Sequence, residues 1–210
     1  MIDPLLLSGG GILACYGSTN IFKVGLGAAL SAIIQRVTNG PSHIAILDPS
    51  GRVFQSTIRS GKNGPQFSTL QDLMSEYSNG GKIDLYKFLP AFTPHWDSLL
   101  ESCTQMDDLR KQGKLCYGYW HLVRDLVARD LSGLPDAPAI ERLTGSQDGV
   151  VCSEAAAIAM EAGGIGWACT LGGVPWLPYS KPTAGAPIGC APADLIPPLL
   201  PIYQPKVQIV

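Results

Sequence analysis

The chain has 210 residues, of which 46% are hydrophobic and 15% are charged, and its formal net charge is −2. This length is enough for one domain with a sizeable core, and the apolar fraction is typical of a globular protein rather than a disordered one. With 15 basic and 17 acidic residues and no basic stripe, the sequence disfavours nucleic acid and anionic membrane surfaces as partners. The 24 glycines and 17 prolines concentrate after residue 162 and predict a loop region at 163–210.

The sequence predicts neither a secretory signal nor an integral membrane segment. Residues 1–7 contain Asp3 and Pro4 and lack a positively charged start. The most apolar stretch, 21–34, is interrupted by Lys23 and two glycines and is too short to cross a bilayer. The six cysteines form no CxxC pair and have no histidine at zinc spacing, so we expect mostly buried free thiols and no metal. A cytoplasmic or phage-associated location is the resulting expectation.

The first third of the chain predicts a strand, a helix and a β-hairpin. Residues 11–16 form a short apolar strand after a glycine-rich turn, and 21–37 carry apolar residues at helical spacing before an Asn-Gly-Pro stop. The segments 42–47 and 52–57 then flank the tetrapeptide 48–51, Asp-Pro-Ser-Gly. Its Asp, Pro and Gly stand where a type I turn with a glycine bulge requires them.

Further short elements follow a glycine-rich loop at 60–65. In chain order, we expect a short helix to Tyr77 capped by Ser68 or Thr69, a strand at 82–88 and a helix at 94–111. A further segment at 113–119, a helix at 120–129 and a loop with lid character at 131–149 come next. An alanine-rich helix at 152–162 then ends at Gly163 and Gly164. The pattern predicts an α+β fold with short antiparallel strands and helices in one domain, 1–210.

Cys152 is the first candidate for chemistry. An apolar pair, Val150 and Val151, leads into it, and a run of good helix formers follows, so Cys152 is expected at a helix N-terminus. The unpaired N–H groups and the dipole at such a position favour negative charge and lower the pKa of a thiol. Taken alone, however, a cysteine before a helix is more often an ordinary buried residue.

His43 is the candidate base, and Gln55 is the candidate group that orients it. The chain has three histidines, and the other two lie in segments with a helical pattern. If the hairpin has the bulged turn, Leu47 faces Val53, and His43 shares a face with Gln55 as a diagonal neighbour, with Cβ atoms roughly 6–8 Å apart. The Gln55 carbonyl can then accept from one imidazole nitrogen. A two-residue turn would break this register, and a packed hairpin with an incidental histidine is the competing interpretation.

Together these segments resemble permuted papain-like enzymes of the NlpC/P60 superfamily. Residues 40–46 and 53–56 (Gly-Pro-Ser-His-Ile-Ala-Ile and Val-Phe-Gln-Ser) are similar to the histidine hairpin of that family, and 150–157 (Val-Val-Cys-Ser-Glu-Ala-Ala-Ala) to its cysteine helix. Residues 192–195, Pro-Ala-Asp-Leu, resemble its terminal segment. The segments beginning at Gly11 and Gly113 also fit, so the resemblance spans residues 10 to 196, with histidine before cysteine as in this branch.

The resemblance implies a circularly permuted papain-like fold, with a small antiparallel sheet or partial barrel packed on helices. It implies Cys152 as nucleophile, His43 as base and Gln55 as third residue, with no cofactor and no metal. Two positions depart from the family pattern: relatives usually carry Glu where this chain has Gln55, and Gly-Asp where it has Gly10-Gly11. A neutral amide orients imidazole but stabilises imidazolium less than a carboxylate does.

The activity implied is that of a cysteine hydrolase that cleaves an amide bond, of peptide or peptidoglycan type, through a thioester acyl-enzyme. The expected partners are a peptide, cell-wall or lipid substrate, and Tyr117, Tyr119 and Trp176 are candidates to line its groove, although core packing is the commoner role of aromatics. Two alternatives stay open. One is a lipid esterase or acyltransferase with the same dyad, and the other is a catalytically idle papain-like structural or binding module.

Overall fold

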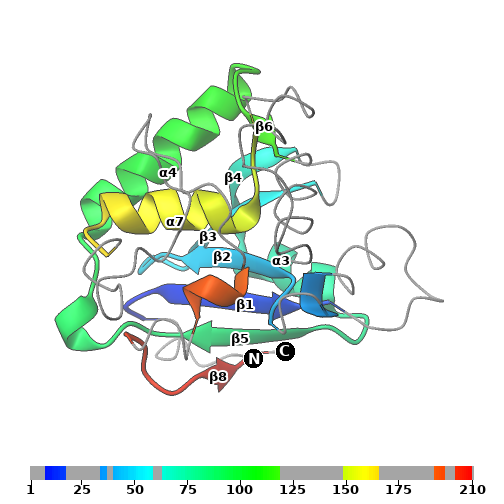
Figure 1. The fold of residues 1–210 in the computed structure, drawn as a ribbon, viewed down its shortest axis with the longest axis vertical. Helices are drawn as coiled ribbons and strands as arrows, with labels where there is room; N and C mark the ends of the chain where they lie inside the picture. Colours follow the sequence, from blue (N-terminus) through cyan, green and yellow to red (C-terminus); the bar gives the residue numbers. More distant parts are fainter. Residues whose placement is uncertain are drawn as a thin grey trace, which may run out of the picture.

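A six-stranded antiparallel sheet forms the centre of the molecule (Figure 1). The computed structural model describes residues 8–17, 34–36, 40–58, 63–118, 149–165, 192–196 and 202–209. The strand order is β4-β3-β2-β1-β5-β8, so the last strand in the sequence lies beside β5 at one edge. The strands are β1 (Gly11–Tyr16), β2 (His43–Leu47), β3 (Arg52–Thr57), β4 (Gly64–Thr69), β5 (Lys82–Tyr86) and β8 (Val207–Gln208).

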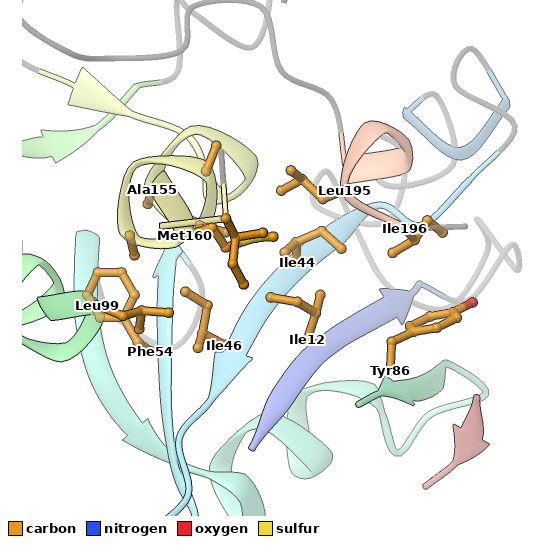
Figure 2. Close-up of a cluster of buried hydrophobic side chains, with 14 of the residues drawn as sticks. Ile12, Ile44, Ile46, Phe54, Tyr86, Leu99, Ala155, Met160, Leu195 and Ile196 are labelled. Carbon is orange, nitrogen blue, oxygen red and sulfur yellow. The ribbon is translucent and has the colours of Figure 1, made fainter. Parts of the chain in front are cut away.

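Two helices cover one face of this sheet. The helix α7 (Cys152–Ala162) contacts β2 and β3, and α4 (Trp96–Lys111) packs against α7 and β4 (Figure 1). Figure 2 shows the hydrophobic core between these helices and the sheet. There, side chains of β1 and β2 pack against Met160 of α7 and Leu195 of the 3-10 segment η6 (Pro192–Leu195). Most of α7 is buried, and its many alanines let the sheet and α4 approach closely. A helix buried nearly all round is a central element, not a surface one.

A shorter helix, α3 (Leu70–Tyr77), supports the opposite face of the sheet. The Thr69 hydroxyl accepts from the Asp72 N–H at 3.0 Å, and the Asp72 carboxylate accepts from the Thr69 N–H at 3.1 Å. This reciprocal capping box satisfies two backbone donors that the helix itself leaves open. Leu73 and Tyr77 then bury against Leu13, Leu47 and their neighbours on the sheet. The sequence prediction of a capped helix ending at Tyr77 is confirmed.

The α+β class and most of the predicted elements are confirmed, but strands lie at three places where loop was expected: β4, β7 (Gly149–Val150) at the end of the loop predicted at 131–149, and β8 within the loop region predicted at 163–210. The segment 60–65 was expected to be loop, but β4 begins at Gly64 and pairs with β3 along its whole length, including Pro65 opposite Ser56. Proline is tolerated there because β4 is an edge strand, which needs no donor on its outer side. The predicted strand at 82–88 ends at Tyr86, and the helix expected from 94 begins at Trp96.

Several expectations fall on residues that the structure does not describe. Of the helix predicted at 21–37, only 34–36 are described, and these are helical. The helix predicted at 120–129 and all of the loop predicted at 131–149 except Gly149 lie outside the described residues, as do most of the loops at 163–210. Within the described ranges, no helix has the length and apolar character needed to cross a bilayer.

Candidate active site

The β2–β3 hairpin is closed at its turn in the way that the sequence predicts. The Gly51 N–H donates to the Asp48 carbonyl at 3.0 Å, and the Asp48 N–H donates to the Arg52 carbonyl at 2.9 Å. Gly51 has a φ of 87°, which the bulge position requires and which favours glycine. The strands pair as Leu47 with Val53 and Ile46 with Phe54. The bulged register, on which the placement of Gln55 depends, is therefore confirmed.

Beyond Ile46 and Phe54 the two strands separate, and the start of α7 fills the opening. Continuing the register by two residues would place Ile44 opposite Ser56. The backbone N–H of Ile44 lies near enough to the sulfur of Cys152 to lower the pKa of its thiol. The Ser56 hydroxyl donates to the Val150 carbonyl at 2.7 Å, just before the helix begins. The N-terminus of α7 is thus anchored to both strands of the hairpin at its open end.

Two further contacts fix this helix start. Val151, the N-cap residue, has extended backbone angles, and its N–H donates to the buried Glu154 carboxylate at 3.0 Å. The short strand β7 (Gly149–Val150) directly precedes α7 in the sequence, and it pairs in parallel with the short strand β6 (Cys116–Tyr117). Gly118 and Gly149 allow their close approach, because a Cβ on Gly149 would lie 2.6 Å from the Cα of Gly118. Cys152 is the first residue of α7, and the prediction of a helix from Cys152 to Ala162 is confirmed.

The pKa of Cys152 is raised rather than lowered overall, although the N–H groups at the start of the helix act in the expected direction. The side chain is only 5% exposed, and burial raises the pKa of the thiol to about 11. The backbone N–H groups of Ile44, Ser153 and Cys152 lower the pKa, and the Glu154 charge raises it, but burial dominates. Taking a charge out of water costs more than these few donors return. At neutral pH the resting group is therefore the thiol, not the thiolate.

His43 and Gln55 meet across the open end of the hairpin. The Nε2 atom of His43 lies 2.8 Å from the Oε1 atom of Gln55, and both side chains are buried. The Nε2 amide group of Gln55 donates in turn to the hydroxyl of Ser68 on β4 at 3.1 Å. The predicted contact between Gln55 and a ring nitrogen of His43 is confirmed. Sequence reasoning missed Ser68, because its approach depends on the pairing of β4 with β3.

Cys152 lies beside the hairpin residues that directly follow His43 and Gln55 in the sequence. Ile44, whose backbone N–H lowers the pKa of the Cys152 thiol, directly follows His43, and Ser56, whose hydroxyl donates to the Val150 carbonyl, directly follows Gln55. Strict strand alternation directs His43 toward the α3 face, whereas α7 packs on the other face. A sulfur-to-imidazole distance of roughly 3–5 Å stays a prediction.

Of the three predicted substrate-lining aromatics, only Tyr117 is described. It is half-buried, pairs with Val150 in the β6–β7 ladder, and its N–H donates to the Asn63 side chain at 3.1 Å. Tyr117 is therefore two residues from Cys152 across adjacent strands, which is compatible with a groove beside the thiol. Tyr119 and Trp176 lie outside the described residues.

Four cysteines lie in the described ranges, and all four are free thiols: Cys15, Cys103 and Cys152 are buried and Cys116 is exposed. Within the same ranges, no group of three His, Cys, Asp or Glu side chains is arranged to hold a metal ion. The chain matches no family model, no curated protein and no solved structure. What the protein does therefore has to be inferred from these residues themselves.

Proposed function

We propose that this protein is a cysteine hydrolase of the circularly permuted papain-like type, which cleaves an amide bond of peptide or peptidoglycan type. One observation carries the proposal. The thiol at the first position of the buried helix α7 lies beside the backbone N–H of Ile44, the residue after His43, and Nε2 of His43 lies 2.8 Å from Oε1 of Gln55. A nucleophile, a base and an orienting group on three different elements are the parts that acyl transfer requires.

The raised pKa of Cys152 decides how this site would begin the reaction. Because the resting thiol is protonated, His43 acts as a general base and takes the proton as sulfur attacks the acyl carbon. The backbone N–H groups at the start of α7 stabilise the negative charge that develops on the carbonyl oxygen. His43 then returns the proton to the leaving amine, and water hydrolyses the thioester to release the acid and restore the thiol. No step needs a metal or a cofactor.

A catalytically idle module is the second candidate, and a specific observation favours it. A thiol that is 5% exposed and has a pKa of about 11 is poorly suited to react with a ligand from solution. On this alternative, Cys152 and Ser56 only anchor α7 to the sheet, and His43 and Gln55 satisfy each other's buried polar atoms. The two candidates differ in whether Cys152 forms a covalent acyl adduct.

Acyl-enzyme trapping separates these candidates. The protein is mixed with p-nitroanilides of short acylated peptides and with p-nitrophenyl acyl esters, and intact mass is measured after rapid acid quenching. We expect one acyl adduct that maps to Cys152, with turnover reduced at least ~1,000-fold by Cys152→Ala and by His43→Ala. Cys116→Ser is the matched control, since it removes an exposed free thiol, and it should leave the adduct unchanged.

Each result has a defined consequence. Adducts with the anilides and esters alike support an amide hydrolase. Adducts with the esters alone overturn the amide assignment in favour of an esterase or acyltransferase. If the wild-type protein forms no adduct with any probe, or if Cys152→Ala forms the same adduct, the hydrolase proposal is overturned.

A further inference from the structure

The first turn of α7 carries a buried carboxylate two residues after Cys152. Glu154 is 1% exposed, and its Oε2 atom accepts from the N–H of Val151, the N-cap residue, at 3.0 Å. Cys152 therefore lies between the two residues that this hydrogen bond joins. The backbone holds the carboxylate at the positive end of the helix dipole, where negative charge is favoured.

The start of α3 shows how such a carboxylate is usually accompanied. There, the Thr69 hydroxyl and the Asp72 carboxylate each accept one backbone N–H, so both members of the box contribute an oxygen. A valine side chain has no oxygen, so Val151 makes no side-chain cap in return. At the start of α7 the side-chain contribution to the cap is therefore the charged group of Glu154.

Glu154 and a thiolate at Cys152 would compete for the same end of the helix. The N–H groups of Cys152 and Ser153 favour negative charge on the sulfur, but the carboxylate already places one negative charge in this turn. A second negative charge in the same buried turn is repelled by the first, because little water separates them. The Glu154 charge accordingly raises the pKa of the thiol, in addition to the larger effect of burial.

We propose that Glu154 is a positioning residue, whose buried carboxylate binds the backbone at the start of α7 and opposes negative charge on the Cys152 sulfur. Cys152 is then kept as a thiol until a base takes its proton. That His43 must supply this base rests on the proposed hydrolase function, whereas the effect of Glu154 on the sulfur does not.

The test separates the charge of Glu154 from its hydrogen bond. Glu154→Gln keeps an oxygen that can accept from Val151 but removes the charge. Alkylation of Cys152 by iodoacetamide in the full-length protein at about pH 7.5 should become about fivefold faster. This is less than the tenfold of one full pKa unit, because burial is the larger cause. Any cation that the carboxylate also meets would act in the same direction once left behind.

Cys103 supplies an internal control in the same measurement. It is fully buried on α4, which packs against α7, so its alkylation reports any opening of the core. The rate at Cys103 should be unchanged in Glu154→Gln. If that variant does not fold, Glu154→Ala removes the same charge with a residue that favours helix, and it should also speed alkylation of Cys152.

Two further variants keep or move the charge. Glu154→Asp retains it, and Asp72 shows that an aspartate at the third helical position reaches the N–H of the N-cap residue. Its Cys152 should be alkylated at the wild-type rate. Glu161→Gln removes an exposed charge near the other end of α7 and should also leave the rate unchanged.

An unchanged or slower rate at Cys152 in the folded charge-free variant would overturn the proposal. An equal rise at Cys103 would overturn it as well, because loosened packing would then be the cause. So would a Glu154→Asp protein that reacts as fast as Glu154→Gln. If the rates respond as expected but wild-type Cys152 forms no acyl adduct, the role of Glu154 stands and the hydrolase function is the part that fails.

Discussion

At its turn, the β2–β3 hairpin is closed by paired backbone and by the side chain of Asp48, whereas at its other end the same strands separate around Cys152. The Asp48 carboxylate accepts from the N–H and hydroxyl of Ser50 and from the N–H and guanidinium of Arg52, all within 2.9 Å. At the open end, the groups that lower the pKa of Cys152 are backbone N–H groups, those of Ile44 and Ser153 among them. Asp48 and Cys152 are buried at the two ends of the same hairpin, but their surroundings differ in the number and strength of donors.

The pKa values of these two groups move in opposite directions. Burial alone would raise the pKa of Asp48, but the hydrogen bonds from Ser50 and Arg52 and the Arg52 charge together lower it. Burial raises the pKa of Cys152 to about 11, and the backbone donors around it only reduce that rise. The comparison shows that burial by itself does not decide the charge of a group. Directed donors, especially charged ones, keep Asp48 ionised, and their scarcity keeps Cys152 neutral.

The largest effect we expect concerns the pH dependence of Cys152 reactivity. The alkylation rate by iodoacetamide should rise about tenfold per pH unit above neutrality and level off only near pH 11. At pH 7 the thiolate population should be about 100-fold below that of a thiol with the ordinary value of 9.0. Mass spectrometry of labelled peptides measures this rate for each cysteine separately.

The raised pKa of Cys152 also makes the free energy of unfolding depend on pH. A pKa raised on folding gives stability that is complete below the ordinary value of 9.0 and is lost as the pH rises toward 11. The wild-type protein should therefore lose stability to urea across this alkaline range by more than Cys152→Ala does. An alkylation midpoint near pH 7 would instead indicate a preformed thiolate–imidazolium pair. The pKa of Cys152 would then be lowered, as that of Asp48 is, and the two ends of the hairpin would not differ in this respect.

Removing the charge at the turn should act on stability and leave the open end unchanged. Asp48→Asn should lower the free energy of unfolding by about 1–3 kcal/mol, because it removes the buried charge and replaces the Oδ2 atom that accepts from the Arg52 guanidinium with an NH₂ group. The pKa of Asp48 is lowered, so its contribution is present above the unfolded-state value of about 3.9 and is lost as the pH falls below it. Urea unfolding at pH 7 and at about pH 3 should therefore differ less in the variant than in the wild type.

Asp108→Asn is the matched control for this change. Asp108 pairs with Lys111 on the surface of α4 and is 53% exposed, so its loss should cost no more than about 1 kcal/mol. Alkylation of Cys152 should be unchanged in both variants. If Asp48→Asn changed the alkylation rate of Cys152 severalfold in a folded protein, the turn and the open end of the hairpin would be coupled and could not be treated as independent environments.

The features that the sequence predicts correctly are those set by residues adjacent to one another in the chain. The turn at 48–51 carries its chemistry in four adjacent residues, and strand parity then places His43 and Gln55 on one face. The start of α7 at Cys152 and its end at Gly163 are also written in neighbouring residues. By contrast, β4 is a strand only because it pairs with β3, and its Gly and Pro looked like loop.

The charge state of Cys152 could not be predicted for a similar reason. Its pKa depends on how tightly the sheet and the rest of the chain bury the helix start, which no neighbouring residue specifies. The contact between Ser68 and Gln55 likewise depends on the register between β3 and β4. Local rules thus predicted the His43–Gln55 contact and the start of α7 at Cys152, whereas the burial of these residues and the groups that surround them followed from packing over the whole sheet.

The smallest effect we expect comes from Gln55. Replacing it with Ala removes the acceptor for Nε2 of His43, but it leaves the sulfur, the ring and the anchor between Ser56 and Val150 in place. Turnover of the anilide or ester probes should fall by about tenfold or less, far below the loss in Cys152→Ala, because a neutral orienter contributes less than either reacting group. Replacing Gln55 with Glu should leave turnover unchanged or raise it, since a carboxylate supports the imidazolium that forms during attack. The Ser68 hydroxyl can turn to donate to this carboxylate, so the new charge would not lack a partner. Loss of turnover in a correctly folded Gln55→Glu protein would show that Gln55 is not the third residue of the site, and the buried His43–Gln55 contact would then be structural only.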